Sequence, residues 1–252
     1  MKQSAIIIVA MTSTLALADN NPGSTPAPVP GATAEIKYPW ESSVSAGLTL
    51  TRGNSDTTLF TADFLTQKKT PDNEYSLGAS GAYGDQNSSD TVNNYKAFGQ
   101  WNHLFTSQFY SYVRAEALRD VIANVDYRVT VGPGAGYYLI KETNTTFAVE
   151  LGAAYVAQHL DGQSEQDYAT VRLAERFEHK FSTKARVWEN VEFLPQVDKF
   201  DNYVINAEIG AEAALTKSFS LKAFLDDSYQ AQPAPGKMKN DAKLIAAVAY
   251  KF

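Results

Sequence analysis

Residues able to carry out chemistry are few in this chain, and none forms a catalytic or metal-binding motif. Cysteine is absent, which excludes disulfides, thiolate nucleophiles, Cys-ligated metals and lipoprotein attachment. The histidines are His103, His159 and His179. No His-Glu-x-x-His pair or Gly-x-Ser-x-Gly elbow occurs. We predict no catalytic, cofactor-binding or metal-binding residues and no cofactor, and we expect a protein that is not an enzyme.

Two weaker patterns have simple structural interpretations. The run Gly132-Pro-Gly-Ala-Gly136 resembles a phosphate-binding loop but leads into another predicted strand, so it offers no helix N-terminus to an anion. We interpret it as small residues that let the sheet bend or let inward side chains pass. Acidic residues gather in the predicted loops without EF-hand spacing. We interpret them as a solvated, repulsive rim rather than a cation site; they are Asp85, Asp90, Asp161, Glu165, Asp167, Asp198 and Asp201.

Apolar residues alternate with polar ones from Trp40 onward, which predicts β-strands because successive side chains of a strand point to opposite faces. In the last segment Leu244, Val248 and Tyr250 share one face, while Lys243 and Lys251 flank the other. Each segment is long enough to cross a bilayer as a tilted strand. Twelve segments are expected: 41–51, 57–68, 74–84, 92–105, 108–118, 126–140, 146–158, 167–181, 184–194, 202–216, 219–229 and 241–252.

Three features favour a membrane barrel over a soluble β-sandwich. Short and long connections alternate, the strand count is even, and aromatic residues lie at the strand ends on the apolar face, as in the interfacial belts of membrane barrels. We predict an all-β fold, a transmembrane antiparallel up-and-down β-barrel over residues 40–252, closed by pairing of the first and last strands. The longer connections are expected at 85–91, 119–125, 159–166, 195–201 and 226–240.

The N-terminal segment has the pattern of a secretory signal. Lys2 precedes an apolar run from Ala5 to Leu17, and Ala16-Leu17-Ala18 fits a small-x-small cleavage site. We expect cleavage after residue 18; the alternative, a membrane anchor, is disfavoured by the short apolar run. Residues 19–39 are rich in Pro, Gly, Ala and Thr and indicate a flexible periplasmic linker. Export without cysteine fits the outer membrane of a Gram-negative bacterium.

The predicted inward face carries charges of both signs, and buried charges need partners. We expect a salt-bridge network across the lumen. It either lines a narrow pore or fills the lumen as a structural core. The expected lumen-lining residues are Lys96, Arg114, Glu116, Arg128, Glu150, Arg172, Arg176, Glu178, Glu192, Glu208, Glu212 and Lys222, with Asp63 and Arg186 on the same face.

Four charged or titratable residues fall on the outward face instead: Glu175, His179, Glu189 and Asp227. His179 and Asp227 lie near strand ends, where a charge costs little. Glu175 and Glu189 lie on neighbouring predicted strands at greater depth. We interpret them as the sign of a bulge that shifts the register; the alternative is a wall that meets something other than lipid.

Several short motifs together resemble the YdiY-like salt-induced outer membrane proteins, the family containing the domain of unknown function 481. The resemblance covers residues 40–252 and depends on Gly53-Asn54-Ser55-Asp56, Asp126-Tyr127-Arg128, Phe177-Glu178-His179-Lys180, Glu192-x-x-Pro195 and Pro235-Gly236. Pro233-Ala234-Pro235 departs from the adjacent prolines often found there. The resemblance implies an outer-membrane location and a role in the envelope response to salt, and it supplies no catalytic residues.

Three functions remain open at this stage. The first is a narrow channel for ions or small solutes. The second is a non-conducting structural envelope protein whose loops contact lipopolysaccharide, and the third and weakest is an outer-membrane enzyme such as a lipase. The formal charge of −6 argues against nucleic acid. Expected partners are outer-membrane lipid, lipopolysaccharide and the barrel-assembly machinery, which would read Tyr250 and Phe252 as an assembly signal. The oligomeric state is left open.

Overall fold

Twelve antiparallel strands make up the fold in a computed structural model that describes residues 38–51, 57–87 and 89–252. The expected signal sequence, most of the linker and the motif 53–56 lie outside these ranges. No helix in the described ranges is long and apolar enough to cross a membrane. The strands are β1 (Glu41–Thr51), β2 (Thr57–Lys69), β3 (Asn73–Gln86), β4 (Ser89–Leu104), β5 (Phe109–Asp120), β6 (Val125–Lys141), β7 (Thr145–Leu160), β8 (Gln166–Lys180), β9 (Ala185–Gln196), β10 (Lys199–Ala214), β11 (Phe219–Gln230) and β12 (Asn240–Lys251).

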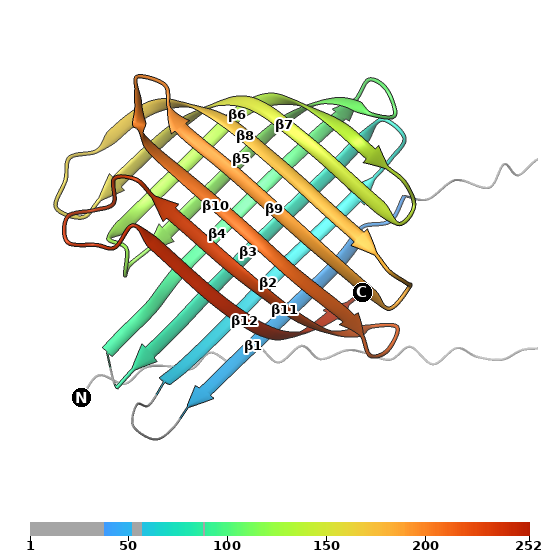
Figure 1. Ribbon diagram of the computed structural model, residues 1–252, viewed down its shortest axis with the longest axis horizontal. Coiled ribbons are helices and arrows are strands. Elements are labelled where there is room, and N and C mark those ends of the chain that lie inside the picture. The colour runs from blue at the N-terminus through green and yellow to red at the C-terminus, as the bar shows by residue number, and fades with distance from the viewer. Residues whose placement is uncertain (1–37, 52–56, 88) are drawn as a thin grey trace, which may run out of the picture. The chain divides into compact units, whose positions relative to one another are not determined.

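The sheet closes on itself, and each strand pairs with its neighbours in sequence (Figure 1). At the seam Val44 of β1 pairs with Tyr250, and Ala46 pairs with Val248. The backbones of Ser42 and Phe252 exchange two hydrogen bonds of 3.0 and 3.2 Å. Closure leaves no unpaired sheet edge, which a strand structure in lipid requires. The predicted up-and-down barrel and its closing pair are confirmed.

At the barrel end opposite Glu41 and Phe252, the strands are longer than the alternation pattern indicated. The connections left there are 87–88, 121–124, 161–165, 197–198 and 231–239. The predicted long connections are therefore wrong except for the last. Asp85 and Asp201, which were expected in these connections, belong to strands, because a β-ladder continues into water with polar side chains. The polar residues therefore indicate the edge of the apolar band, and the strands continue beyond that edge.

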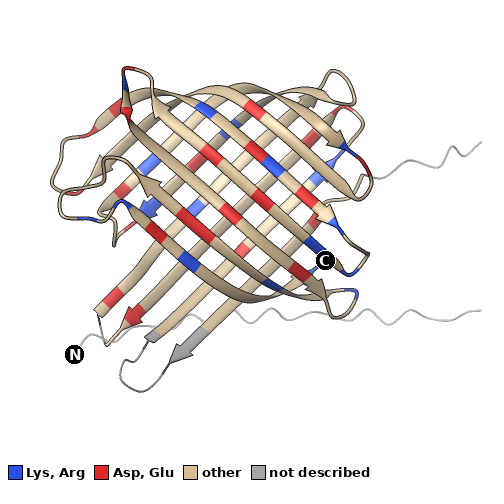
Figure 2. Ribbon diagram, viewed as in Figure 1, with Lys and Arg blue, Asp and Glu red and all other residues tan. Residues whose placement is uncertain are grey.

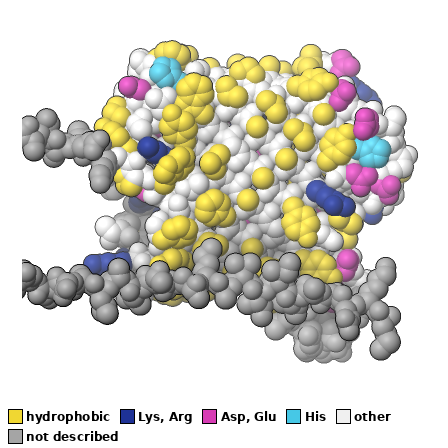
Figure 3. Space-filling view, turned by 180° about the vertical axis from the view of Figure 1, so that it is seen from behind, with side chains coloured by type: hydrophobic (Ala, Val, Ile, Leu, Met, Phe, Trp, Pro, Cys, Tyr) yellow, Lys and Arg dark blue, Asp and Glu magenta, His cyan; other side chains and the backbone are white. Residues whose placement is uncertain are grey.

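The outer wall carries the apolar half of each strand. Leu48, Leu151 and Leu244 are 61%, 58% and 75% exposed, whereas Ile245 and Ala247, on the opposite face of β12, are buried. On the face seen in Figure 3, hydrophobic side chains cover the strands, and charged side chains and histidines gather toward the two ends. Tyr83, Tyr95, Tyr127 and Tyr155 are exposed at one end, and Phe105, Phe109, Phe181 and Phe219 at the other. The two aromatic belts fit the two interfaces of a membrane.

Glu175 and Glu189 lie on this outer wall without any register shift. Glu175 pairs with Val149 and Val191, and Glu189 pairs with Phe177 and Ile209. The β7–β8 and β8–β9 ladders keep one register throughout, so the interpretation of a bulge is wrong. Within the described residues neither carboxylate has a hydrogen-bond or ion-pair partner. Both are surrounded by apolar neighbours.

Removing the charge of these outward carboxylates should therefore stabilise the barrel in a bilayer. For Glu189→Gln and Glu175→Gln we expect a gain of about 1 kcal/mol each in the free energy of unfolding, since a charge facing hydrocarbon is unfavourable. Urea unfolding in phospholipid vesicles at neutral pH, followed by tryptophan fluorescence, measures the gain. Glu142→Gln, in an exposed turn, is the matched control and should change nothing. A loss of stability in either variant would contradict a lipid-facing carboxylate.

Candidate functional site

The charged lumen is the candidate functional site, and all twelve predicted lumen residues lie on the inward face. Figure 2 shows charged positions spread along the middle of the strands, whereas the outer surface in Figure 3 shows charges mainly toward the ends. The register explains the difference. Lys222, for example, pairs with Ala247 and Glu212, both of which are buried. Alternation along each strand thus directs the charged positions into the lumen.

Glu150 of β7 is the centre of the most buried network. Its side chain is 1% exposed, and it accepts hydrogen bonds from Gln100 at 2.9 Å and from Tyr110 at 2.8 Å. Arg172 lies 2.6 Å from it, and Arg176 forms a second ion pair. A buried carboxylate with this many donors is well satisfied. The network joins β4, β5, β7 and β8 and holds these walls together across the lumen.

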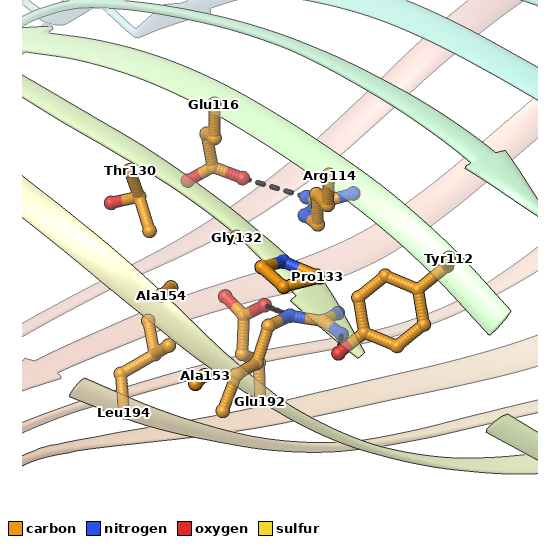
Figure 4. A pocket seen from close by; sticks show the side chains of 11 residues that line it. Tyr112, Arg114, Glu116, Thr130, Gly132, Pro133, Ala153, Ala154, Glu192 and Leu194 are labelled. Atoms are coloured by element: carbon orange, nitrogen blue, oxygen red, sulfur yellow. Dashed lines mark hydrogen bonds and ion pairs between the residues drawn. The ribbon is translucent and has the colours of Figure 1, made fainter. Parts of the chain in front are cut away.

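Three further ion pairs lie near the middle of the lumen, and two of them are drawn in Figure 4. Arg114 and Lys96 pair with Glu116 at 2.7 and 3.3 Å, and Arg172 pairs with Glu192. Between them lies a cavity of about 20 Å³, which has room for about one water. The space between these ion pairs is therefore nearly filled.

A second network links the strands at the end where the chain terminates. Arg186 of β9 pairs with Glu178 and, at 2.7 Å, with Glu212. Lys251 of β12 reaches Glu212 at 2.5 Å. Glu208 accepts a hydrogen bond of 2.5 Å from Trp188, an inward aromatic residue that sequence reasoning missed. Arg128, at the other end, donates to Gln158 at 2.7 Å and to Gln230 at 3.0 Å.

Inward tyrosines complete the packed side, and the sequence motif 132–136 makes room for them. Tyr110 and Tyr112 are 1% and 3% exposed. A Cβ at Gly136 would overlap the Tyr110 ring, and one at Gly134 would overlap Tyr112. The tyrosines were not predicted as lumen residues, although the glycines signalled that inward side chains pass there. Tyr138 donates to Glu74 at 2.6 Å; Glu74 was missed because it stands at a strand end.

Some inward side chains, including members of these networks, border open space in the lumen. Lys96 and Arg176 each keep 36% of the side chain exposed, and Lys251 keeps 45%. Asp63 accepts a hydrogen bond of 3.2 Å from Ser45, and it lies within electrostatic range of Lys222 and Asp226. Packing in the lumen is thus uneven: Glu150 and Arg172 are buried, whereas Lys96 of β4 and Arg176 of β8 border open space.

The histidines and loop acids remain dispersed. His103 lies 3.3 Å from Asn73, His179 lies 2.9 Å from Thr145, and His159 lies 3.5 Å from Asp126. Asp90 and Glu165 accept hydrogen bonds from Tyr83 and Tyr127. Nowhere in the described ranges do three or more His, Asp or Glu side chains form a group that could hold a metal ion.

A closed sheet with an apolar outer band, aromatic belts and a charged interior defines a transmembrane β-barrel of the outer-membrane type. Within that class, the chain belongs to the family described as Protein of unknown function, DUF481, whose sequence model matches residues 44–252. The domain of unknown function 481 indicated by the sequence motifs is thereby confirmed.

Solved structures share this architecture. The NanC porin superposes with a TM-score of 0.53 at 7% identity, covering 84% of this chain and 100% of that one. The COG4313 outer membrane channel from Pseudomonas putida F1 gives 0.52 at 9% identity, covering 90% and 100%. At such low identity the likeness establishes the fold alone. No curated protein sequence matches the chain.

Because Gly136 accommodates Tyr110, Gly136→Ala should loosen the network around Glu150. The added methyl group must displace the tyrosine ring and with it the Tyr110–Glu150 hydrogen bond. We expect a loss of about 1–3 kcal/mol in the free energy of unfolding, measured by urea titration in vesicles. In the control Gly99→Ala the new Cβ meets the flexible Leu77 side chain at 3.1 Å, so the loss should be smaller. Equal stability of the two variants would argue against close packing at Gly136.

Proposed function

We propose that the protein is a narrow, passive channel of a bacterial outer membrane for ions or small solutes. The observation that carries this proposal is the accessible surface left on the Lys96 side chain. Its position near the middle of β4 puts it at mid-height in the barrel, yet 36% of its side chain is exposed. A side chain that only filled the lumen would be buried like Glu150. Water-accessible space at this depth is what a conducting path needs.

The arrangement of charges suits small hydrated solutes rather than one particular ion. Most inward charges are paired across short distances, so their fields largely cancel along the path. Lys96 pairs with Glu116 at 3.3 Å but is the more exposed partner, at 36% against 15%. It is the basic group best placed to influence a passing ion. Ion preference in such a pore depends on the few charges that keep contact with water.

A non-conducting structural protein is the second candidate, and the Glu150 network favours it. Glu150, Arg172, Tyr110 and Tyr112 are all buried and fill one side of the lumen. Ion pairs across the lumen would rigidify the wall even if no solute passed. In that case the acidic rim and loops would contact lipopolysaccharide. An outer-membrane enzyme is the weakest candidate, because the histidines are dispersed and none is hydrogen-bonded to a serine in the described ranges.

The location and partners form part of the same proposal. The apolar band and aromatic belts support residence in the outer membrane, in contact with phospholipid and lipopolysaccharide. Tyr250 is 41% exposed on the outer face and stacks on Phe252 at 5.9 Å. An outward aromatic pair of this kind is accessible to an assembly machinery. The link to salt stress is a proposal that depends on the family resemblance alone.

Planar-bilayer recording tests the channel directly. The wild-type barrel should give small, discrete conductance steps. Lys96→Glu should raise the cation-to-anion permeability ratio by about tenfold, because an elementary charge a few ångströms away is worth about 1 kcal/mol even in watery surroundings. The ratio is read from the reversal potential in a KCl gradient. Lys217→Glu, the same change in an exposed turn, should shift it far less.

The two candidate functions give different results in this experiment. A folded wild-type barrel without conductance would contradict the channel proposal. If Arg172→Ala then conducted while the wild type did not, the charge network would be a structural filling. Heat-modifiable migration on gels shows that each variant is folded.

We further propose that residues 1–18 are a signal sequence removed during export. The chain isolated from an outer-membrane fraction should begin at Asp19. N-terminal sequencing or intact mass measures this directly. Ala18→Arg, which places a bulky charged residue before the cleavage site, should leave the uncleaved precursor. An intact Met1 in the membrane fraction would indicate an anchor instead.

A further inference from the structure

The barrel end opposite Glu41 and Phe252 contains a cavity that the channel proposal does not use. Its volume is about 460 Å³, within the roughly 300–1,000 Å³ usual for small-molecule sites. Its walls come from the ends of β7–β10 and from the connection 231–239. Six primary amides line it: Gln158, Gln163, Gln166, Gln196, Asn202 and Gln232.

The connection 231–239 bounds the cavity as a strap across the mouth. It leaves β11 beside β10, where the Ala231 amide donates to the Tyr203 carbonyl at 2.9 Å. It then reaches the ends of β6 and β7, where buried Ala234 packs against Val125 and Leu160. Below it, Arg128 of β6 donates to Gln230 of β11. The strap and this bridge separate the cavity region from the rest of the mouth.

Hydrogen bonds among the amides fix their orientation before any ligand arrives. Gln158 donates to Gln166 at 2.9 Å, and Gln166 donates to Gln163 at 2.9 Å. On the adjoining strands Asn202 of β10 donates to Gln196 of β9 at 2.7 Å. Each primary amide has two N–H donors and a carbonyl acceptor. After these bonds, further N–H and C=O groups remain available in both amide pairs. The result is a preorganised array of neutral donors and acceptors.

The charged side chains at the cavity are hydrogen-bonded to neutral partners. Glu165 accepts a hydrogen bond from Tyr127, and Asp167 is hydrogen-bonded to Tyr155; both tyrosines belong to the outward belt. Lys199 donates to Gln232 of the strap at 2.7 Å. The ring of Tyr168 and the apolar surfaces of Leu160 and Pro233 complete the lining. The cavity therefore offers an array of neutral amides and an aromatic surface beside two carboxylates and one ammonium group.

We propose that this cavity binds a neutral, hydroxyl-rich ligand of the size of a mono- or disaccharide. A sugar hydroxyl both donates and accepts, so adjacent hydroxyls match the paired N–H and C=O groups of an amide. The C–H face of a sugar ring packs on an aromatic side chain such as Tyr168. The lining has two carboxylates and one ammonium group, which disfavours an anion. The site is independent of conduction, because binding can occur whether or not the lumen passes solutes.

Saturation-transfer NMR on the full-length barrel in dodecylphosphocholine, a detergent without a sugar headgroup, tests this site. The probes are maltose, lactose and trehalose, with glucuronate as the charged comparison. We expect at least one disaccharide to give a saturable signal and glucuronate to bind more weakly. Gln166→Leu on β8 and Asn202→Leu on β10 should each weaken binding about tenfold, the loss expected for one or two hydrogen bonds.

Gln67→Leu is the matched control, because Gln67 lies near the other end of the lumen and bonds Ser76. It should bind as the wild type does. Added lipopolysaccharide distinguishes the source of the sugar: competition assigns a lipid headgroup, and an unchanged signal assigns a soluble sugar, and both support the site. Heat-modifiable migration confirms folding of each variant. Absence of a saturable signal for all three disaccharides, preference for glucuronate, or wild-type binding by both wall variants would overturn the proposal.

Discussion

Backbone hydrogen bonding is the constraint on which this structure depends. In hydrocarbon an unpaired N–H or C=O has no water to bind, so a sheet is stable there only when it closes. The seam between β1 and β12 provides that closure, with Val44 opposite Tyr250 and Ala46 opposite Val248. Once the ring is closed, alternation assigns every side chain to lipid or to lumen. The apolar wall, the aromatic belts and the charged interior all follow from that one condition.

The lumen shows how a barrel handles charges that cannot reach bulk water freely. Glu150 has two arginines, a tyrosine and an amide around it, because a buried carboxylate without such partners would be strongly destabilising. The glycines of β6 allow the tyrosine rings to enter this network. Polar satisfaction and close packing are thus met by the same residues. The space around Lys96 is less densely packed, and this uneven packing is the basis for the channel proposal.

Predictions from sequence succeeded where a feature depends only on residues close together in the chain. A period of two along the chain set the twelve strands and the inward position of residues such as Arg172 and Glu208. It failed for the loops, since Asp85 and Asp201 are polar residues that still extend a ladder. It also failed for Glu175 and Glu189, where departure from the pattern was attributed to a bulge. The register shows that the pattern itself is interrupted, with two carboxylates among apolar neighbours on the outer wall.

The sequence by itself determined the fold class, the two faces of each strand and the family, because each follows from residue type at fixed spacing. Only the tertiary structure decided which inward groups meet. Gln100 of β4 reaches Glu150 of β7, Tyr112 of β5 contacts Arg172 of β8, and Arg128 of β6 bridges to Gln230 of β11. These strands are not hydrogen-bonded neighbours. Their contacts depend on the curvature and stagger of the closed sheet, which no local pattern encodes.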